Sequence, residues 1–207
     1  MLVPSQSSCA EKEEIVTSKQ EFPEKMHSER LILRRYHLHD ARGVLEMVER
    51  NRNSLLREFE QQAQLRDADG VRGFIAEKQE QWEEGKAFCY GIWPKDGNGP
   101  IGQIQVKNID WKVPAAELSY FIDASLHRQG LATESIRRVM AMMLDELGFM
   151  RLFVRVLPSN RASLALALKL GFQDEGLHRL AFRCGLGELH DVHHLALTRE
   201  PGGAKKQ

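Results

Sequence analysis

Residues 126–135, LHRQGLATES, combine a guanidinium, a glycine and small side chains at a point where a predicted strand gives way to a predicted helix. The first amides of a helix have no intrahelical acceptor, and the helix dipole places partial positive charge at the same end. Gly130 lets the backbone approach a ligand, Ala132 keeps the helix mouth narrow, and Arg128 can bind phosphate oxygens. The loop therefore predicts a site for a phosphorylated ligand, and a pyrophosphate would use the whole row of amides. The alternative interpretation is an ordinary helix start that happens to contain Gly and Arg.

A second polar pair follows the next predicted strand. Residues 158–160, Pro-Ser-Asn, lead into a short apolar helix, and Ser163 lies three residues beyond Asn160. This spacing places both side chains on one helical face, one turn apart. The alternative for Ser163 is a first-turn serine bonded to the backbone.

Hydrophobic periodicity predicts the elements that position these residues. Helical spacing predicts four helices, which begin after Asp40, after Asp67, at the glycine-containing loop and at Asn160. A full helix separates the strands near 118 and 157, so these strands must pair in parallel or splay apart. The pattern favours an α/β (α+β) fold, a mixed sheet with helices on both faces. Strands are expected at 30–36, 87–93, 101–109, 116–123 and 151–156, and in two segments from 172 onward.

Composition bounds the kinds of partner. The 207 residues contain 29 Lys plus Arg and 29 Asp plus Glu, so no overall charge favours nucleic acid or an acidic membrane. Three widely spaced cysteines (Cys9, Cys89 and Cys184) fit a reducing compartment, with Cys89 expected in the core. The sequence shows neither a bilayer-length apolar stretch nor the pattern of a signal peptide, so we expect a cytoplasmic protein. Polar composition predicts tails at 1–27 and 201–207 around one domain at 28–200.

Together the two polar motifs resemble those of the GNAT superfamily of acyl-CoA-dependent N-acyltransferases. The resemblance is strongest to the Rim-type group, which acetylates the N-termini of ribosomal proteins. The family's pyrophosphate signature, Gln/Arg-x-x-Gly-x-Gly/Ala, is matched by 127–132, and the resemblance covers roughly 28–198. The second family motif, Asn-x-x-Ser followed by Leu-Gly-Phe and Glu-Gly, is matched by Asn160, Ser163, Leu170, Gly171, Phe172, Glu175 and Gly176.

The resemblance implies a single GNAT-like domain. Its central sheet would be mixed, mostly antiparallel and six- to seven-stranded, with helices on both faces and a splayed parallel strand pair at the acyl-CoA site. It also implies acetyl-CoA as cosubstrate, no metal, and direct attack of a primary amine in a ternary complex. The residues expected to bind acetyl-CoA are Phe121, Ile122, His127, Arg128, Gln129, Gly130, Leu131, Ala132, Thr133, Asn160 and Ser163.

Such a reaction needs a base and an acid. An amine attacks a thioester only in its neutral form, so a carboxylate must take its proton, and Glu117, in the strand before the phosphate loop, is the best candidate. The alternative for Glu117 is a solvated strand carboxylate. The departing thiolate needs a proton, and the resemblance places Asn160 against the pantetheine arm and Ser163 near the thiol. A tyrosine often donates this proton in the superfamily; because 160–170 contains none, Ser163 is the predicted donor. A backbone amide of 119–122, where the family carries a bulge, would hold the oxyanion.

Three positions depart from the family pattern. His127 replaces the leading Gln or Arg, Ser119 replaces a Gly, and Arg183 stands where Rim-type enzymes have a Glu that assists catalysis, with Glu188 five residues on. The acceptor therefore stays open between a protein or peptide N-terminus and a small amine such as a polyamine, amino acid or antibiotic. A non-catalytic acyl-CoA-binding module is a further alternative. Residues 52–66, which mix charges with amides, are expected to line the acceptor cleft and favour a peptide.

Two other clusters are weaker candidates. The segment HDVHH (190–194) offers metal ligands, but strand alternation separates them and no further Cys or His pair accompanies them. Arg34, Arg35 and Arg42 are expected on a solvated face rather than in a nucleic-acid patch. We expect a monomer or a homodimer, with acetyl-CoA and an amine acceptor as its partners.

Overall fold

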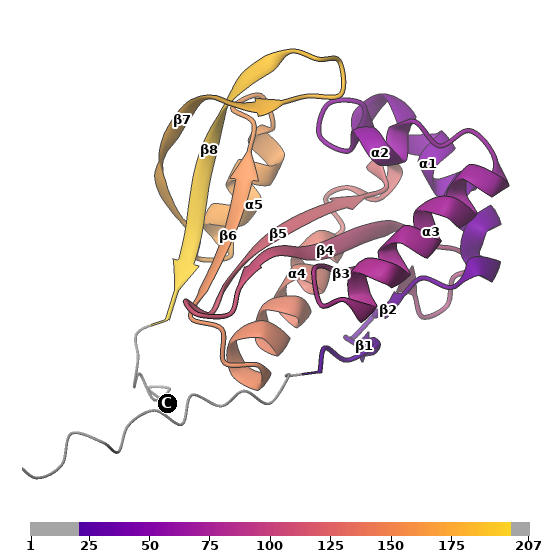
Figure 1. Ribbon diagram of the computed structural model, residues 1–207, viewed down its shortest axis with the longest axis horizontal. Helices are drawn as coiled ribbons and strands as arrows, with labels where there is room; N and C mark the ends of the chain where they lie inside the picture. Colours follow the sequence, from indigo (N-terminus) through magenta and orange to yellow (C-terminus); the bar gives the residue numbers. More distant parts are fainter. Residues whose placement is uncertain (1–20, 200–207) are drawn as a thin grey trace, which may run out of the picture.

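The first half of the chain forms an antiparallel sheet with three helices over one of its faces (Figure 1). The computed structural model describes residues 21–199. Single 3-10 turns at Leu38–Asp40 and Ala124–Leu126 precede the first helix and the phosphate loop. The other elements of this half are β1 (Lys25–His27), β2 (Leu31–Arg35), α1 (Ala41–Leu55), α2 (Glu60–Ala63), α3 (Ala68–Glu83), β3 (Phe88–Pro94), β4 (Gly102–Asp110) and β5 (Ala115–Ile122).

The second half covers the other face and extends the sheet. α4 (Leu131–Ala141) continues into π-helical turns at Met142–Glu146, and the chain then reverses at Gly148, whose φ is +67°. β6 (Arg151–Val156), α5 (Arg161–Lys169), β7 (Gln173–Arg183) and β8 (Leu189–Thr198) follow. The strand order across the sheet is β1-β2-β3-β4-β5-β6-β8-β7. The predicted helices and strands are all present, and β1 and the short α2 are additions that periodicity did not predict.

β5 and β6 form the parallel pair that the crossover helix requires. They pair over three residues, from Ala115 opposite Arg151 to Glu117 opposite Phe153. Beyond Glu117, β5 continues to Ile122 beside β4, whereas β6 diverges toward β8 (Figure 1). The backbone groups of β5 that point away from β4 thereby lose a strand partner, and a ligand can take its place. The predicted splayed pair is confirmed.

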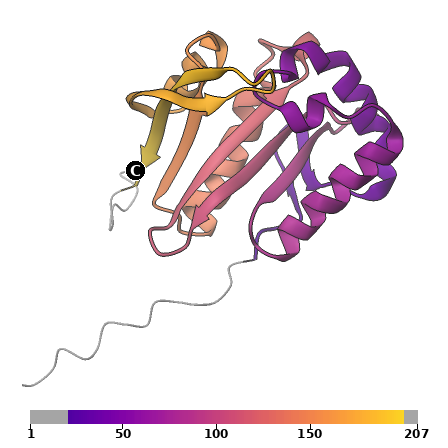
Figure 2. The ribbon, with the colours of Figure 1, turned by 45° about the horizontal axis from the view of Figure 1, so that its top comes forward.

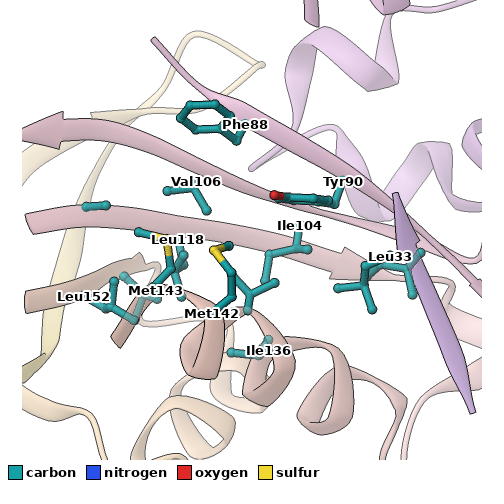
Figure 3. Close-up of a cluster of buried hydrophobic side chains, with 14 of the residues drawn as sticks. Leu33, Phe88, Tyr90, Ile104, Val106, Leu118, Ile136, Met142, Met143 and Leu152 are labelled. Atoms are coloured by element: carbon teal, nitrogen blue, oxygen red, sulfur yellow. The ribbon is translucent and has the colours of Figure 1, made fainter. Parts of the chain in front are cut away.

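Alternation along the strands separates two apolar cores, one on each face of the sheet. In β3, Phe88 and Tyr90 belong to the core beneath α4, whereas Cys89 belongs to the core beneath α1 and α3. Figure 2 shows the sheet between these two helical layers, and Figure 3 shows side chains of the first core. Burial raises the pKa of the Cys89 thiol to about 12, as fits the predicted core residue. Within residues 21–199, every helix is too short or too polar to cross a bilayer.

The sheet has eight strands rather than six to seven, because residues 22–27 belong to the fold. We expected them in an N-terminal tail. β1 pairs with β2, while Phe22 and Met26 are buried, and Phe22 stacks on Phe88 with ring centroids 3.5 Å apart. A few apolar groups in a Glu- and Lys-rich segment are thus enough to complete the core. Residues 1–20, with Cys9, and the expected C-terminal tail at 201–207 lie outside the described residues.

The expected bulge in 119–122 is wrong. β5 pairs with β4 in regular register from Glu117 to Ile122. The irregularity lies on the opposite strand, between Lys107 and Asp110, where Asn108 has a φ of +49°. Asn tolerates this left-handed conformation better than most residues. It allows the Asn108 side chain to donate a hydrogen bond to the Glu117 carboxylate.

The arginine cluster is only partly solvated. Arg34 donates two hydrogen bonds to Asp40 (2.7 and 2.8 Å) and stacks over Trp93, 3.8 Å from the ring centroid. Arg35 is paired with two glutamates and is largely covered, whereas Arg42 is exposed as predicted. Arg34 therefore covers Trp93 of the core beneath α1 and α3, and Arg35 covers Trp82 of the core beneath α4. A guanidinium can pair with a carboxylate and cover an indole at the same time.

Candidate active site

Two adjoining cavities lie where β5 and β6 diverge. The larger, about 640 Å³, lies between the second half of β5, residues 126–133 and α5. The smaller, about 60 Å³, lies at the splay, between β5, β6 and the turn that joins α1 to α2. The two cavities share a set of lining residues and so form one continuous site: Glu58, Phe59, Tyr120, Asn160 and Ser163.

The loop 126–133 presents the start of α4 to the larger cavity. Arg128 and Gly130 have φ angles of +63° and +80°, which turn the chain sharply before the helix. The first hydrogen bond within α4 joins the Glu134 amide to the Gly130 carbonyl (2.9 Å). The amides of 131–133 therefore precede the helical ladder, and these residues line the cavity. This is the geometry that the predicted pyrophosphate site requires, and binding there stays a prediction.

Arg30 holds the loop 126–133 and the first turn of α4 in place. Its Nε lies 2.7 Å from Glu134 Oε2, its amide donates to Oε1 of the same carboxylate (2.7 Å), and Nη1 donates to the Gln129 carbonyl (3.1 Å). Burial alone would raise the pKa of Glu134, but hydrogen bonds from the Arg30 amide, the Ser28 hydroxyl and the Arg30 guanidinium outweigh it and lower that pKa. Glu134 is thus ionised, and the Arg30 guanidinium offsets its negative charge. The carboxylate therefore repels a phosphate at the start of α4 less than an unpaired carboxylate would. No local spacing predicts the pair, because 104 residues separate its members.

Asp123 fixes the beginning of the loop. Its buried carboxylate accepts hydrogen bonds from Arg50 Nε and from the Ser125 hydroxyl, both at 2.8 Å. Burial would raise the pKa of Asp123, but these hydrogen bonds lower it. His127, the departure from the family's Gln or Arg, places Nε2 3.1 Å from the Ile122 carbonyl and lines the larger cavity. Its imidazole is therefore held beside β5.

The start of α5 brings the predicted Asn160 and Ser163 together with two unpredicted partners. Asn160 Oδ1 caps the helix by accepting the Ser163 amide (3.1 Å), and Asn160 Nδ2 donates to Glu58 Oε1 (2.7 Å). Ser163 Oγ lies 3.1 Å from the Tyr120 hydroxyl. Burial raises the pKa of Tyr120, and the nearby Glu58 carboxylate raises it further, while the Ser163 hydrogen bond opposes them. Tyr120 therefore stays a phenol and can donate a proton through Ser163.

Glu117 is the last residue of β5 that pairs with β6, and its side chain is almost fully buried. Its Oε1 lies 3.1 Å from Arg155 Nε and 3.6 Å from Lys107 Nζ, and its Oε2 accepts the Asn108 amide. The predicted base thus lines the smaller cavity, and its catalytic role stays a prediction. Both of its oxygens are engaged by strands on either side.

The other predicted residues line the larger cavity, line the smaller cavity or lie outside both. All of the residues expected to bind acetyl-CoA line the larger cavity except Gln129, whose side chain is exposed and whose carbonyl is bound by Arg30. Ser119 lines the smaller cavity. Arg183 is exposed and donates to the Gly187 carbonyl (2.7 Å), while its neighbour Phe182 lines the smaller cavity.

The segment 52–66 contributes less polarity to the site than expected. Residues 54–55 and 58–59 line the cavities. Arg52 and Arg66 instead donate to backbone carbonyls of the same segment, at 2.6 to 2.7 Å. These bonds satisfy carbonyls at the end of α2 and in the chain that leads to α3, where helical partners are missing.

The histidines of 190–194 line neither cavity, and two of them are engaged by Asp174 and His178. Among residues 21–199, one set of side chains has possible metal-ligand atoms within 4.8 Å of one another, in the β7–β8 hairpin: Cys184, Glu188 and His190. None of these three lines a cavity, so this set offers no chemistry to the cleft.

Comparison with known proteins gives this architecture a family. Residues 30–173 match the model described as "Acetyltransferase (GNAT) domain". "Probable N-acetyltransferase YjcK" of Bacillus subtilis (strain 168) is 30% identical over 160 residues, which are 74% of this chain and 86% of the relative. The self-immunity acetyltransferase MccE, solved with acetyl-CoA and AMP, has a TM-score of 0.78 at 19% identity, over 87% of this chain and 99% of MccE. An acetyltransferase of Salmonella typhimurium that modifies the N-terminal serine of a ribosomal subunit protein has a TM-score of 0.74 at 24% identity, over 84% and 97% of the two chains.

Proposed function

The chain belongs to the GNAT acetyltransferase family, and from that premise we propose that it transfers the acetyl group of acetyl-CoA to the terminal amine of a peptide or protein. N-acetyl transfer from acetyl-CoA is the activity of its family. We propose the class of acceptor and the roles of the residues that bind it and act on it. The Salmonella typhimurium neighbour modifies an N-terminal serine, which agrees with this acceptor class, although its similarity to this chain shows the fold alone.

The observation that carries the proposal is the charge of the site. Glu58 and Glu117 are the carboxylates that line the cavities. Glu117 is neutralised by Arg155 and Lys107, whereas Glu58 has no basic partner among the described residues. One unneutralised carboxylate suits one ammonium group. A polyamine or an aminoglycoside carries several positive charges and requires several carboxylates, and a free amino acid would bring its own carboxylate toward Glu58.

Apolar groups beside Glu58 support a peptide acceptor. Phe59 and Phe182 line the smaller cavity, and the Phe59 ring packs against Phe121 with centroids 5.0 Å apart. These rings can receive the first side chain of a peptide whose amine lies at Glu58. A cavity of about 60 Å³ favours a small first side chain such as that of Ala, Ser or Thr.

The donor side follows from the phosphate loop. In this proposal the amides of 131–133 bind the pyrophosphate, and Asn160 together with the free edge of β5 holds the pantetheine arm. The amine attacks the thioester carbonyl directly, and amides of 119–122 that β6 does not pair stabilise the oxyanion. The Tyr120–Ser163 pair then donates a proton to the departing thiolate.

Thiol release from acetyl-CoA tests the acceptor. The panel contains peptides with free N-terminal Ala, Ser or Thr, the same peptides formylated at the amine, spermidine and an aminoglycoside. We expect release with the free peptides and none with the formylated ones. Turnover of spermidine or the aminoglycoside with none of the peptides would overturn the proposed acceptor.

Thermal unfolding with and without acetyl-CoA separates the enzyme from a binding module. A ligand that binds only the folded state at about 100 times its Kd stabilises that state by about 2.7 kcal/mol, so the melting temperature should rise. A rise in melting temperature with no thiol release for any amine indicates a module that binds acetyl-CoA without turnover. No rise for a folded protein would contradict the donor assignment.

A further inference from the structure

We propose that Glu58, rather than the predicted Glu117, is the general base of the acetyl transfer, an inference that rests on the proposed function. Glu58 lies in the turn between α1 and α2 and lines both cavities. It is therefore placed where the acceptor amine and the acetyl donor must meet.

The contacts of Glu117 suit a residue that holds strands together better than a general base. Arg155 comes from β6, and Lys107 and Asn108 come from β4, so the carboxylate joins three strands at the point where the sheet splays. Protonation of Glu117 would weaken both ion pairs and leave two cations unpaired at a largely buried site. An amine at this position would also have to share an oxygen with a donor that Glu117 already has.

Among the described residues, Glu58 has neither the ion pairs of Glu117 nor two engaged carboxylate oxygens. Its polar contact within residues 21–199 is the neutral Asn160 amide at 2.7 Å, which engages Oε1 and leaves Oε2 for an incoming amine. Burial raises the pKa of Glu58, while the Asn160 hydrogen bond opposes that rise. A raised pKa brings the carboxylate closer to neutral pH, where a general base is most effective.

The polar groups nearest Glu58 are uncharged and come from two elements. Tyr120 faces it from β5 and Asn160 from the start of α5. No cation contacts Glu58 within 4.0 Å in the described part of the chain. The other titratable groups that line the two cavities are Lys107, Glu117, His127, Arg128, Arg155 and Lys169.

The turn that carries Glu58 is held in place from both sides. The Phe59 amide bonds the Leu55 carbonyl (2.8 Å), and Arg52 bonds two carbonyls of the chain that follows. The β7–β8 hairpin packs against the turn so closely that a Cβ on Gly185 would lie 2.4 Å from the Leu56 carbonyl oxygen. Such a fixed carboxylate fits a positioned base better than an exposed loop residue would.

The step balances without another reactant. The Glu58 carboxylate first takes a proton from the bound ammonium group, and the neutral amine nitrogen then forms a bond to the thioester carbonyl carbon. The nitrogen, now positively charged, loses a second N–H proton to solvent. The carbon–sulfur bond then breaks, and the thiolate takes a proton from the Ser163 hydroxyl, which is replenished from Tyr120. Glu58 releases its proton to solvent, and Tyr120 regains one, so the amide and free CoA thiol are the products.

The test compares three isosteric variants in the complete chain: E58Q, E117Q and E60Q. Glu60 is the matched control, because it is exposed, lies two residues away and contacts Gln64 rather than either cavity. The readouts are kcat/KM against pH with a free-amine peptide, and the melting shift with acetyl-CoA. General bases contribute about 100- to 10,000-fold, so E58Q should lose about 100-fold at neutral pH.

That loss should shrink above about pH 9, where an α-amine whose pKa is about 8 is already neutral. E58Q should also recover with a hydrazide acceptor, which is neutral at pH 7 without any base. The acetyl-CoA melting shift should be retained in E58Q, and E60Q should stay within about two-fold of the parent, as surface changes usually do. E117Q should lower the melting temperature without removing this pH dependence.

Two results would overturn the inference alone: an active parent with an equally active E58Q at every pH, or a loss of the pH-dependent limb in E117Q and not in E58Q. A parent that acetylates no amine would overturn the proposed function and the inference with it.

Discussion

The two sides of the cleft are built in different ways. The proposed donor wall, residues 126–133 and 160–163, consists of two helix starts whose backbone amides and capping side chain are neighbours in sequence. The proposed acceptor wall, Glu58, Phe59, Glu117 and Phe182, takes side chains from a turn, a central strand and an edge strand. A donor wall made of backbone groups serves one constant ligand. An acceptor wall made of side chains from distant segments can change its specificity one residue at a time.

The first prediction tests whether the donor wall binds acetyl-CoA through its backbone amides. Gly130→Val should weaken acetyl-CoA binding by about 100-fold, because a β-branched residue is strained at a φ of +80° and its side chain would crowd the loop amides. A Cβ at this position would already lie 3.4 Å from Arg30 Nη2. Isothermal titration with acetyl-CoA measures the effect.

Gly148→Val is the matched control for Gly130→Val. Gly148 has a φ of +67° and is exposed, and a Cβ added there would meet nothing within 4 Å, so the variant carries the same kind of strain far from the cleft. It should lose stability by a similar amount, about 1–2 kcal/mol, and keep its affinity. Equal losses of affinity in both variants would mean that strain rather than the loop geometry explains the effect.

The same contrast explains how much could be predicted from sequence. Seven of the eight strands, the four main helices and the donor wall follow from local patterns: apolar periods of two and 3.6, and a glycine before a helix. The residues 126–133 are contiguous, so their geometry needs no knowledge of the rest of the fold. Gln129 is the exception, since its side chain is exposed outside the larger cavity while its carbonyl is bound by the distant Arg30.

The acceptor wall could not be predicted in this way. Glu58 and Asn160 are 102 residues apart, and Tyr120 and Ser163 are 43 apart, so their contacts exist only after the sheet is assembled. Glu117 is visible in the strand pattern, but the ion pairs that occupy it come from β4 and β6. The N-terminal strand β1 was missed for a related reason: three residues become a strand only because β2 is there to pair with them.

The second prediction concerns the place where the two walls meet. Ser163→Ala and Tyr120→Phe should each lower kcat by about 10- to 100-fold and leave acetyl-CoA affinity nearly unchanged, because each removes one hydroxyl of a proton-donating pair. The double variant should be little worse than the more damaged single variant, since the two hydroxyls act as one unit. Steady-state kinetics together with titration of acetyl-CoA separates the two parameters.

The pH dependence of these variants has a definite sign. Burial raises the pKa of Tyr120, so its phenol stays protonated below that raised value, throughout the neutral range. The loss should therefore be the same at every neutral pH, unlike that of E58Q. If only Ser163→Ala slowed turnover, the serine that local spacing predicts would be sufficient, and Tyr120 would have no part in proton transfer.

The smallest effects are expected from two neighbours on the edge strand, and they sharpen the description of the acceptor wall. Phe182 lines the smaller cavity, so Phe182→Ala should raise the KM for a peptide acceptor by about 10-fold, the range expected when a hydrophobic contact to a substrate is lost, with acetyl-CoA affinity unchanged. Arg183 is exposed, and its guanidinium donates to the Gly187 carbonyl, so Arg183→Ala should change both parameters by less than about two-fold. Arg183→Glu, which restores the carboxylate of the Rim-type pattern at this position, should not raise the rate, because the side chain lies outside both cavities. A faster Arg183→Glu variant would place the hairpin carboxylate at the reacting amine and would show that the acceptor wall rearranges when its substrate binds.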